Sequence, residues 1–207
     1  MISFIYFDIG GVLIKDVGSS DKWTDLKKYI GVKKEFDKEF DKLFYEYQHK
    51  ELCLNRDVDT LIPIFSEKFG MKFPNNYSFL RDLVNRFEKN DSVWPLVYKL
   101  KEKVKLGLLT NIFPKMLDLC FEKDLLPSVD WNVIIDSSVV GFQKPDVGIY
   151  SLAEEKSGVK KDEILYIDDA KKNIDAANKF GWKTILYDRN NPEESNIIIY
   201  NTCSQFL

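Results

Sequence analysis

The sequence predicts an α/β protein in which an all-α helical bundle is inserted into a Rossmann-like, doubly wound parallel sheet. Three observations carry this prediction. Short apolar runs alternate with helical segments over most of the chain, polar residues directly follow several of those runs, and residues 15–91 contain only amphipathic helical patterns. Alternating strands and helices favour a parallel sheet with helices on both faces, because parallel strands need a crossover connection.

The strands of this sheet are expected at residues 3–7, 104–109, 133–136, 164–167 and 184–187. After the fourth of them, residues 170–181 carry Ile174, Ala177 and Phe180 at helical spacing. Ligands of such sheets bind beyond the carboxyl ends of the strands, near the point where the strand order reverses. A functional site is therefore expected at those strand ends.

The inserted bundle is predicted to hold four helices. Their apolar faces lie in residues 23–30, 36–47, 58–69 and 77–87, and a glycine follows the first and the third. Aromatic residues of the second helix are expected in the core of the bundle, namely Phe36, Phe40, Phe44 and Tyr47. Trp23 and Tyr45 are candidates to line a cleft instead.

The boundaries of the two parts follow from these patterns. The chain is expected to return from the bundle at Asn90, Asp91 and Ser92. The α/β core then comprises residues 1–14 and 92–207, and the bundle comprises residues 15–91. Residues 196–207 show no pattern that places them.

Composition excludes several classes of function. The chain has 207 residues, 44% of them hydrophobic, which is enough for a sizeable core. A net charge of −3 with both signs interspersed gives no electrostatic reason to expect nucleic acid or an anionic membrane as a partner. No stretch approaches the roughly 20 apolar residues that cross a bilayer. The apolar start lacks the basic segment and cleavage site of a secretory signal, so a cytoplasmic location is expected.

The three cysteines are expected to be small buried hydrophobic residues. Cys53, Cys120 and Cys203 are odd in number and widely spaced, without a Cys-x-x-Cys pair. This spacing argues against a disulfide framework or a zinc site and favours a reducing compartment.

Polar side chains stand where the expected strands end. Asp8 interrupts an apolar run at a glycine turn, where a carboxylate can be presented as a nucleophile. In chain order the candidates are Asp8 followed by Gly10 and Gly11, Thr110 with Asn111, Lys144 before Pro145, and the pair Asp168 and Asp169. Any of these residues taken singly is explained as a helix cap, a turn residue or a surface charge. Their convergence at strand ends is what indicates a site.

These segments resemble the four ordered motifs of the haloacid dehalogenase (HAD) superfamily, and the inserted bundle resembles the helical cap of its subfamily I. The resemblance spans nearly the whole chain. With Gly10 in its first motif, the chain is similar to the members in which this motif reads Asp-x-Gly-Gly or Asp-x-Gly-Asn. Among these, the α-D-glucose-1-phosphate phosphatase group is similar in all four segments.

The resemblance implies a magnesium-dependent phosphatase that acts on a small phosphorylated metabolite, in the first instance a sugar phosphate. Asp8 would attack phosphorus and form an aspartyl-phosphate, while Lys144 neutralises charge and Thr110 and Asn111 hold the phosphoryl oxygens. Gly10 and Gly11 would line the substrate site. Mg²⁺ would be bound by Asp8, the main-chain carbonyl of Gly10 and the acidic pair, with Asp169 as the direct ligand, Asp168 beside it and Asn173 bracing the turn. Oligomeric state is left open.

Gly10 also marks a departure from the superfamily, because many members have an aspartate there that protonates the leaving oxygen. A general acid or base typically contributes about 10²–10⁴ in rate. Its absence predicts a preference for leaving groups that need little protonation, such as an anomeric oxygen or an acyl group. His49 and Asp16 are candidates to replace it. Their plainer interpretations are an exposed histidine at a helix end and a capping or hinge residue.

Two other functions remain open at the level of the sequence. One is a carbon–halogen hydrolase of the same superfamily, against which the pair Asp168 and Asp169 counts, because these carboxylates would repel the attacking Asp8. The other is a binding or regulatory module that kept the fold without the activity, since a fold does not by itself guarantee catalysis.

Overall fold

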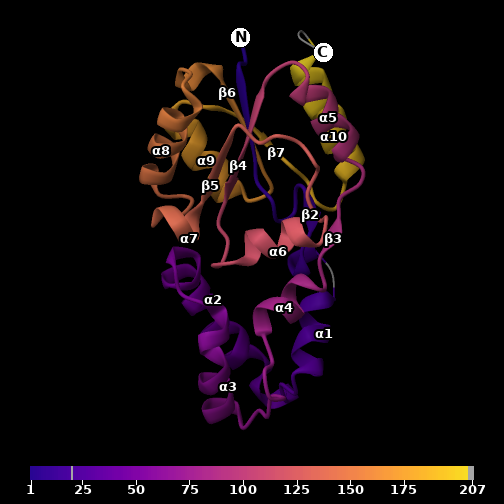
Figure 1. Ribbon diagram of the computed structural model, residues 1–207, viewed down its shortest axis with the longest axis vertical. Helices are drawn as coiled ribbons and strands as arrows, with labels where there is room; N and C mark the ends of the chain where they lie inside the picture. Colours follow the sequence, from indigo (N-terminus) through magenta and orange to yellow (C-terminus); the bar gives the residue numbers. More distant parts are fainter. Residues whose placement is uncertain (20, 205–207) are drawn as a thin grey trace.

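The computed structural model describes residues 1–19 and 21–204. Its larger sheet has five parallel strands in the order β5-β4-β1-β6-β7 (Figure 1). They are β1 (Phe4–Phe7), β4 (Lys105–Thr110), β5 (Val133–Asp136), β6 (Ile164–Asp168) and β7 (Lys183–Leu186). The prediction of a parallel α/β sheet is confirmed, and the strand order reverses between β1 and β6.

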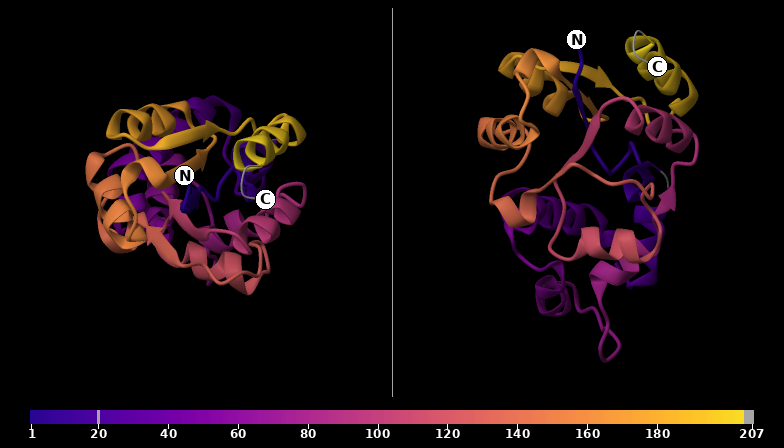
Figure 2. Two further views of the ribbon diagram at one scale, coloured as in Figure 1. Left: turned by 90° about the horizontal axis from the view of Figure 1, so that it is seen from above. Right: turned by 45° about the horizontal axis from the view of Figure 1, so that its top comes forward.

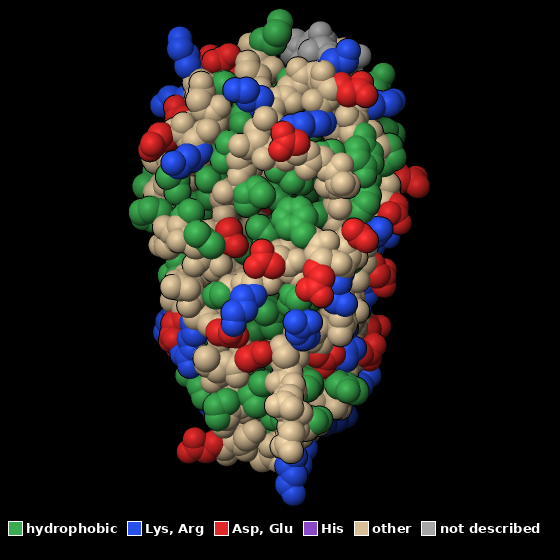
Figure 3. All heavy atoms as spheres, viewed as in Figure 1, with side chains coloured by type: hydrophobic (Ala, Val, Ile, Leu, Met, Phe, Trp, Pro, Cys, Tyr) green, Lys and Arg blue, Asp and Glu red, His purple; other side chains and the backbone are tan. Residues whose placement is uncertain are grey.

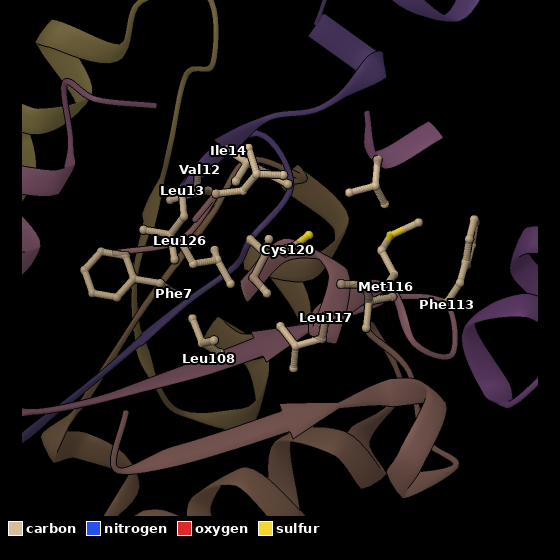
Figure 4. Close-up of a cluster of buried hydrophobic side chains, with 14 of the residues drawn as sticks. Phe7, Val12, Leu13, Ile14, Leu108, Phe113, Met116, Leu117, Cys120 and Leu126 are labelled. Carbon is tan, nitrogen blue, oxygen red and sulfur yellow. The ribbon is translucent and has the colours of Figure 1, made fainter. Parts of the chain in front are cut away.

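Helices cover both faces of this sheet (Figure 2). One face packs against α5 (Trp94–Lys101), α6 (Met116–Glu122) and α10 (Pro192–Cys203), and the other packs against α8 (Val147–Ser157) and α9 (Lys171–Phe180). The short α7 (Ser137–Val140) follows β5. Side chains alternate between the faces: Phe7 joins the first core cluster, whereas Tyr6 joins the second and donates a hydrogen bond to the carbonyl of Ala153 at 2.7 Å. In Figure 4, Phe7 and Leu108 of the sheet face the buried side of α6.

The inserted segment lies at one end of the molecule, at the bottom in Figure 1. It contains α1 (Lys22–Tyr29), α2 (Asp37–Lys50), α3 (Ile62–Phe69) and α4 (Phe79–Val84). The expectation that it is helical throughout is wrong at its ends, because β2 (Ile14–Lys15) pairs antiparallel with β3 (Glu88–Lys89). The third predicted helix is also divided: residues 58–61 form a 3-10 turn, and α3 begins beside Pro63, which suits a first helical turn. The division between core and cap at residues 15 and 91 stays a prediction.

Aromatic rings form the core of the helical cap, as the sequence predicts. Phe40 and Phe44 are buried, and the ring centroids of Phe40 and Phe65 lie 4.7 Å apart. Trp23 lies equally close to Phe44, at 4.7 Å. One contact reaches the α/β core, because Phe44 meets the edge of Phe113 at 6.2 Å. The cap helices therefore share one continuous hydrophobic cluster with the sheet and α6.

The C-terminal segment that the sequence left unplaced forms most of α10. Ile199 and Cys203 are buried against the sheet, whereas Ile197 and Ile198 are exposed. The apolar residues of this run lie on both faces of the helix, so the sequence shows no amphipathic pattern from which a helix could be predicted. Residues 205–207 of that tail lie outside the described residues.

The structure also shows the state of the cysteines, the distribution of surface charge and the lengths of the helices. All three cysteines are buried free thiols. Basic and acidic side chains are interspersed over the face seen in Figure 3. Among the described residues, every helix is too short or too polar to cross a membrane.

Candidate active site

The ends of three adjacent strands bring the candidate residues together. β1 lies between β4 and β6 in the sheet. Asp8 follows β1, Thr110 is the last residue of β4, and Asp168 is the last residue of β6, with Asp169 next to it. Lys144 reaches the same place from the loop between α7 and α8. Asp8, Asp168 and Asp169 each offer a carboxylate oxygen, and these oxygens lie within 4.8 Å of one another.

Lys144 is the buried cation of this cluster. Its ammonium group lies 2.9 Å from Asp8 Oδ1 and 2.7 Å from Asp168 Oδ2, and it donates a third bond to the carbonyl of Leu109 at 2.9 Å. Burial alone would lower the pKa of Lys144, but the carboxylates of Asp168 and Asp8 raise it above its usual value. Lys144 therefore stays charged beside the proposed nucleophile.

Asp168 holds the cluster around Lys144 together through hydrogen bonds. Its Oδ2 accepts hydrogen bonds from Lys144 and the Tyr166 hydroxyl, and its Oδ1 accepts one from the Ala170 N–H at 2.7 Å. The Asn173 amide donates to both oxygens, at 3.2 and 3.1 Å, which agrees with its expected bracing role. Burial would raise the pKa of Asp168, but Lys144, the Tyr166 hydroxyl and the Ala170 N–H lower it. These hydrogen bonds to both of its oxygens favour a supporting role for Asp168 over direct metal binding. Asp8 and Asp169 are the carboxylates that can more readily face a cation.

Asn111 acts on Lys144 from the other side. Its side-chain amide donates to the carbonyl of Lys144 and its side-chain oxygen accepts from the Lys144 N–H, both at 2.8 Å. This reciprocal pair fixes the loop that carries Lys144 to the end of β4. One N–H of the Asn111 amide is therefore used within the protein, and we assign the expected contact with a phosphoryl oxygen to the Asn111 main-chain N–H.

Arg189 is a site residue that the sequence analysis missed. Its guanidinium group pairs with Asp169 and lies 3.0 Å from Asp16 Oδ1. Gly11 has a φ of +75°, and a Cβ there would collide with Arg189 and Asp169. The sequence did indicate this residue, because Arg189 follows the last predicted strand at the same edge of the sheet as the other polar residues.

Gly10 leaves space that Asp16 fills. A Cβ placed on Gly10 would lie 2.8 Å from Asp16 Oδ2. Asp16 also accepts a hydrogen bond from the Gly18 N–H at 2.8 Å, and it lines the same cavity as Gly10 and Thr110. His49, the other candidate replacement, is exposed on α2, where its ring contacts the carbonyl of Tyr45. Of the two, the structure brings Asp16 to the site.

The fold and this cluster define a hydrolase of the HAD type, and comparison with known proteins agrees. The model of the haloacid dehalogenase-like hydrolase family matches residues 2–181. The chain belongs to this family. Rhythmically expressed gene 2 protein of Drosophila melanogaster is 36% identical over 89 residues, which are 41% of this chain and 34% of that protein. The chain therefore matches about a third of the length of this relative.

Solved structures show the same fold at low sequence identity. A predicted HAD-like family hydrolase from Porphyromonas gingivalis has a TM-score of 0.75 at 24% identity, over 96% of this chain and 98% of that one. A HAD family enzyme from Bacteroides thetaiotaomicron in complex with magnesium and inorganic phosphate has a TM-score of 0.74 at 21% identity, over 91% and 96% of the two chains. L-2-haloacid dehalogenase from Xanthobacter autotrophicus has a TM-score of 0.63 at 22% identity, over 89% and 76%.

The donor set fits a hard divalent cation. Asp8 and Asp169 offer carboxylate oxygens, the kind of ligand that Mg²⁺ prefers. Four carboxylates, those of Asp8, Asp16, Asp168 and Asp169, face two cationic side chains, Lys144 and Arg189, which leaves a formal local charge of −2. A divalent cation would neutralise this excess.

The charge excess predicts a pH-dependent response to magnesium. Burial, together with the carboxylates of Asp168 and Asp169, raises the pKa of Asp8 to about 8 against the opposing effect of Lys144. Because the folded pKa exceeds the unfolded value of about 4, this group stabilises the fold at low pH, and its contribution is lost as pH rises toward 8. Mg²⁺ must displace the proton, so its affinity is expected to fall roughly tenfold per pH unit below that pKa.

Melting temperatures with and without Mg²⁺ at pH 8 and pH 5.5 check this expectation. The increase caused by Mg²⁺ should be larger at pH 8, and the difference should shrink in Asp8→Asn, which cannot titrate. An equal increase at both pH values in the wild-type chain would contradict it.

Arg189→Gln is expected to bind Mg²⁺ more tightly, by about tenfold, because one positive charge beside Asp169 is removed. Calorimetric titration with Mg²⁺ measures the change. Arg86→Gln is the matched control, since Arg86 pairs with Asp82 in the cap at 3.1 Å and should leave the affinity unchanged. Unchanged or weaker binding in Arg189→Gln would mean that Arg189 does not compete with the cation.

Proposed function

We propose that this hydrolase is a magnesium-dependent phosphatase that cleaves the monoester of a small phosphorylated metabolite through an aspartyl-phosphate on Asp8. One observation carries the proposal. Asp8 stands at the carboxyl end of the central strand, 2.9 Å from a buried lysine and within a cluster of three carboxylates. A nucleophile held beside a fixed cation and a cation-binding cluster suits attack on an anionic phosphate.

In the first step a carboxylate oxygen of Asp8 attacks phosphorus, and the bond between phosphorus and the ester oxygen breaks. Lys144 offsets the charge of the phosphoryl group, and the Thr110 hydroxyl and the Asn111 main-chain N–H hold its oxygens. Water then attacks the phosphorus of the aspartyl-phosphate, which releases phosphate and restores Asp8. Magnesium, held by Asp8, the carbonyl of Gly10 and Asp169, would supply further neutralisation of charge.

Asp16 is the residue that best replaces the general acid missing at Gly10. Its Oδ2 lies next to the space where a side chain on Gly10 would begin, and its Oδ1 is fixed by Arg189 and the Gly18 N–H. A carboxylic acid there would protonate the leaving oxygen in the first step, and the resulting carboxylate would deprotonate water in the second. If Asp16 supplies the proton, the substrate does not need an easily released leaving group, although position 10 carries no acid.

Carbon–halogen hydrolysis is less well supported. A haloacid dehalogenase shares the fold, but a likeness at 22% identity extends to the fold alone. Burial, together with the carboxylates of Asp168 and Asp169, raises the pKa of Asp8, and these two carboxylates would oppose an uncompensated attack on carbon.

Phosphate release from a panel of sugar phosphates, nucleotides and acyl phosphates tests the proposal. Release is expected with Mg²⁺ and is expected to stop when a chelator removes it. Release at the same rate in chelator would contradict the magnesium requirement. Halide release from 2-haloacids without phosphate release would favour the dehalogenase.

Four finer predictions belong to this proposal: membership of subfamily I, similarity to the α-D-glucose-1-phosphate phosphatase group, a sugar phosphate as substrate and a cytoplasmic location. The preference for an easily released leaving group is tested by comparing glucose 1-phosphate with glucose 6-phosphate, which differ in leaving oxygen but not in sugar.

A further inference from the structure

A cavity of about 190 Å³ lies between the strand ends and the helical cap. Gly10, Thr110 and Asn111 line it on the side of the sheet, so it borders the proposed phosphate site. Trp23 and Tyr45 line it from the cap, as the sequence allowed. An engineered cavity of about 150 Å³ accommodates benzene. This one therefore has room for a single six-membered ring and a short linker.

Most of the remaining lining is apolar. Loops near the sheet, α6 and the cap all contribute: Ile9, Ile14, Val17, Phe44, Leu83, Phe87, Ile112, Phe113 and Met116. Phe113 and Met116 lie at the edge of the core cluster in Figure 4. Phe113 is held there by the ring of Phe44. The apolar wall is thus built from packed side chains of both parts of the molecule.

Polar groups in the lining are largely occupied by the protein itself. The side-chain amide of Asn111 is paired with the backbone of Lys144. The Trp23 indole N–H donates to Asp41 Oδ1 at 2.7 Å. Asp16 and Thr110 also line the cavity, and the proposed mechanism uses both. The remaining polar side chains of the lining are Gln48 and Tyr45, and neither has a side-chain hydrogen bond within the described part of the chain. Such a wall can satisfy one or two ligand hydroxyls.

We infer that the leaving group of the substrate is a small, mainly apolar ring or chain with at most one or two polar groups. This inference rests on the proposed phosphatase function, and it replaces the sugar that the sequence suggested. A sugar ring carries a hydroxyl on most of its carbons, and each one buried without a partner weakens binding by roughly tenfold. An apolar ring of the same size loses nothing by entering this cavity and gains from leaving water.

Two phosphate esters of matched shape test the inference. Cyclohexylmethyl phosphate and glucose 6-phosphate both join a saturated six-membered ring to phosphate through one CH₂ group, so they differ chiefly in ring hydroxyls. Their dissociation constants are measured by calorimetry with the Asp8→Asn protein and Mg²⁺, where no turnover occurs. Cyclohexylmethyl phosphate is expected to bind at least tenfold more tightly. Equal or tighter binding of glucose 6-phosphate, or binding of neither ester, would overturn the inference.

Variants of the cavity wall give a second measurement in the same Asp8→Asn background. Met116→Gln should narrow the preference for the apolar ester, because it adds an amide to the wall, whereas Gln48→Met should widen it. Met71→Gln is the matched control, since Met71 is buried in the cap but does not line the cavity. A preference unchanged by both Met116→Gln and Gln48→Met would assign it to another surface and overturn the inference.

Turnover by the wild-type protein separates this inference from the proposed function. If the apolar ester binds preferentially but no ester is hydrolysed, the proposed function fails and the cavity assignment stands. If glucose 6-phosphate is bound more tightly and hydrolysed with Mg²⁺, the phosphatase stands and the cavity assignment fails.

Discussion

Lys144→Met is expected to destabilise the fold by about 3–5 kcal/mol and to abolish phosphate release. Lys144 is buried between Asp8 and Asp168, so its removal leaves two carboxylates without their cation in the interior. The loss should be larger at pH 7, where Asp168 is charged, than at pH 4, because Asp8, whose pKa is raised to about 8, takes up its proton first and Asp168 follows as the pH falls. Denaturant unfolding at pH 7 and pH 4 measures it.

Lys171→Met provides the control for this change. Lys171 also pairs with an aspartate, Asp175, at 2.7 Å, but both side chains are exposed, and exposed pairs contribute about 0–1 kcal/mol. A loss in Lys144→Met no larger than in Lys171→Met would mean that the buried ion pairs do not hold the site together.

Asp16→Asn is expected to slow the hydrolysis of alkyl phosphates by about 10²–10⁴, the usual contribution of a general acid or base. Acetyl phosphate should be affected much less, because its leaving group needs no proton. Asparagine keeps an oxygen that can accept from Arg189 and the Gly18 N–H. The ratio of kcat/KM for an alkyl phosphate to that for acetyl phosphate is therefore the measurement. Equal losses on both substrates would indicate a structural role for Asp16.

Gly10→Asp provides a reciprocal test of the same residue. A side chain at position 10 begins 2.8 Å from Asp16 Oδ2 and brings two carboxylates together, so this change alone should lower activity. Combined with Asp16→Gly, it should restore part of the activity, because a single acid is again present. Higher activity in Gly10→Asp alone would show that the space is not occupied by a working acid.

The sequence alone was sufficient for the sheet and much of the candidate site, for a physical reason. Parallel strands end at one edge of a sheet, so polar residues that follow apolar runs meet there even when far apart in the chain. Asp8, Thr110 and Asp168 obey this rule. Lys144 does not, because it lies in a loop, and only the resemblance to the family indicated its place.

Other features depend on contacts that no local pattern encodes. Asp16 and Arg189 are separated by 173 residues, and their pairing exists only once the sheet has formed. The short strands β2 and β3 pair with each other at the base of the cap. Each has only two residues, which is too short for a strand to be predicted from the sequence. The apolar character of the cavity likewise arises from side chains that the cap and α6 contribute together.

Phosphate release by the wild-type protein and by Asp8→Asn, with Mg²⁺ and the best substrate of the panel, tests the central claim most directly. The wild-type protein is expected to release phosphate, and Asp8→Asn is expected to be slower by a factor on the order of 10⁴ or more, because it lacks the nucleophile. Circular dichroism should show that both proteins are folded. Undiminished release by Asp8→Asn would contradict Asp8 as the nucleophile. If a folded, magnesium-binding wild-type protein released no phosphate from the panel or from cyclohexylmethyl phosphate, a binding or regulatory module would be favoured.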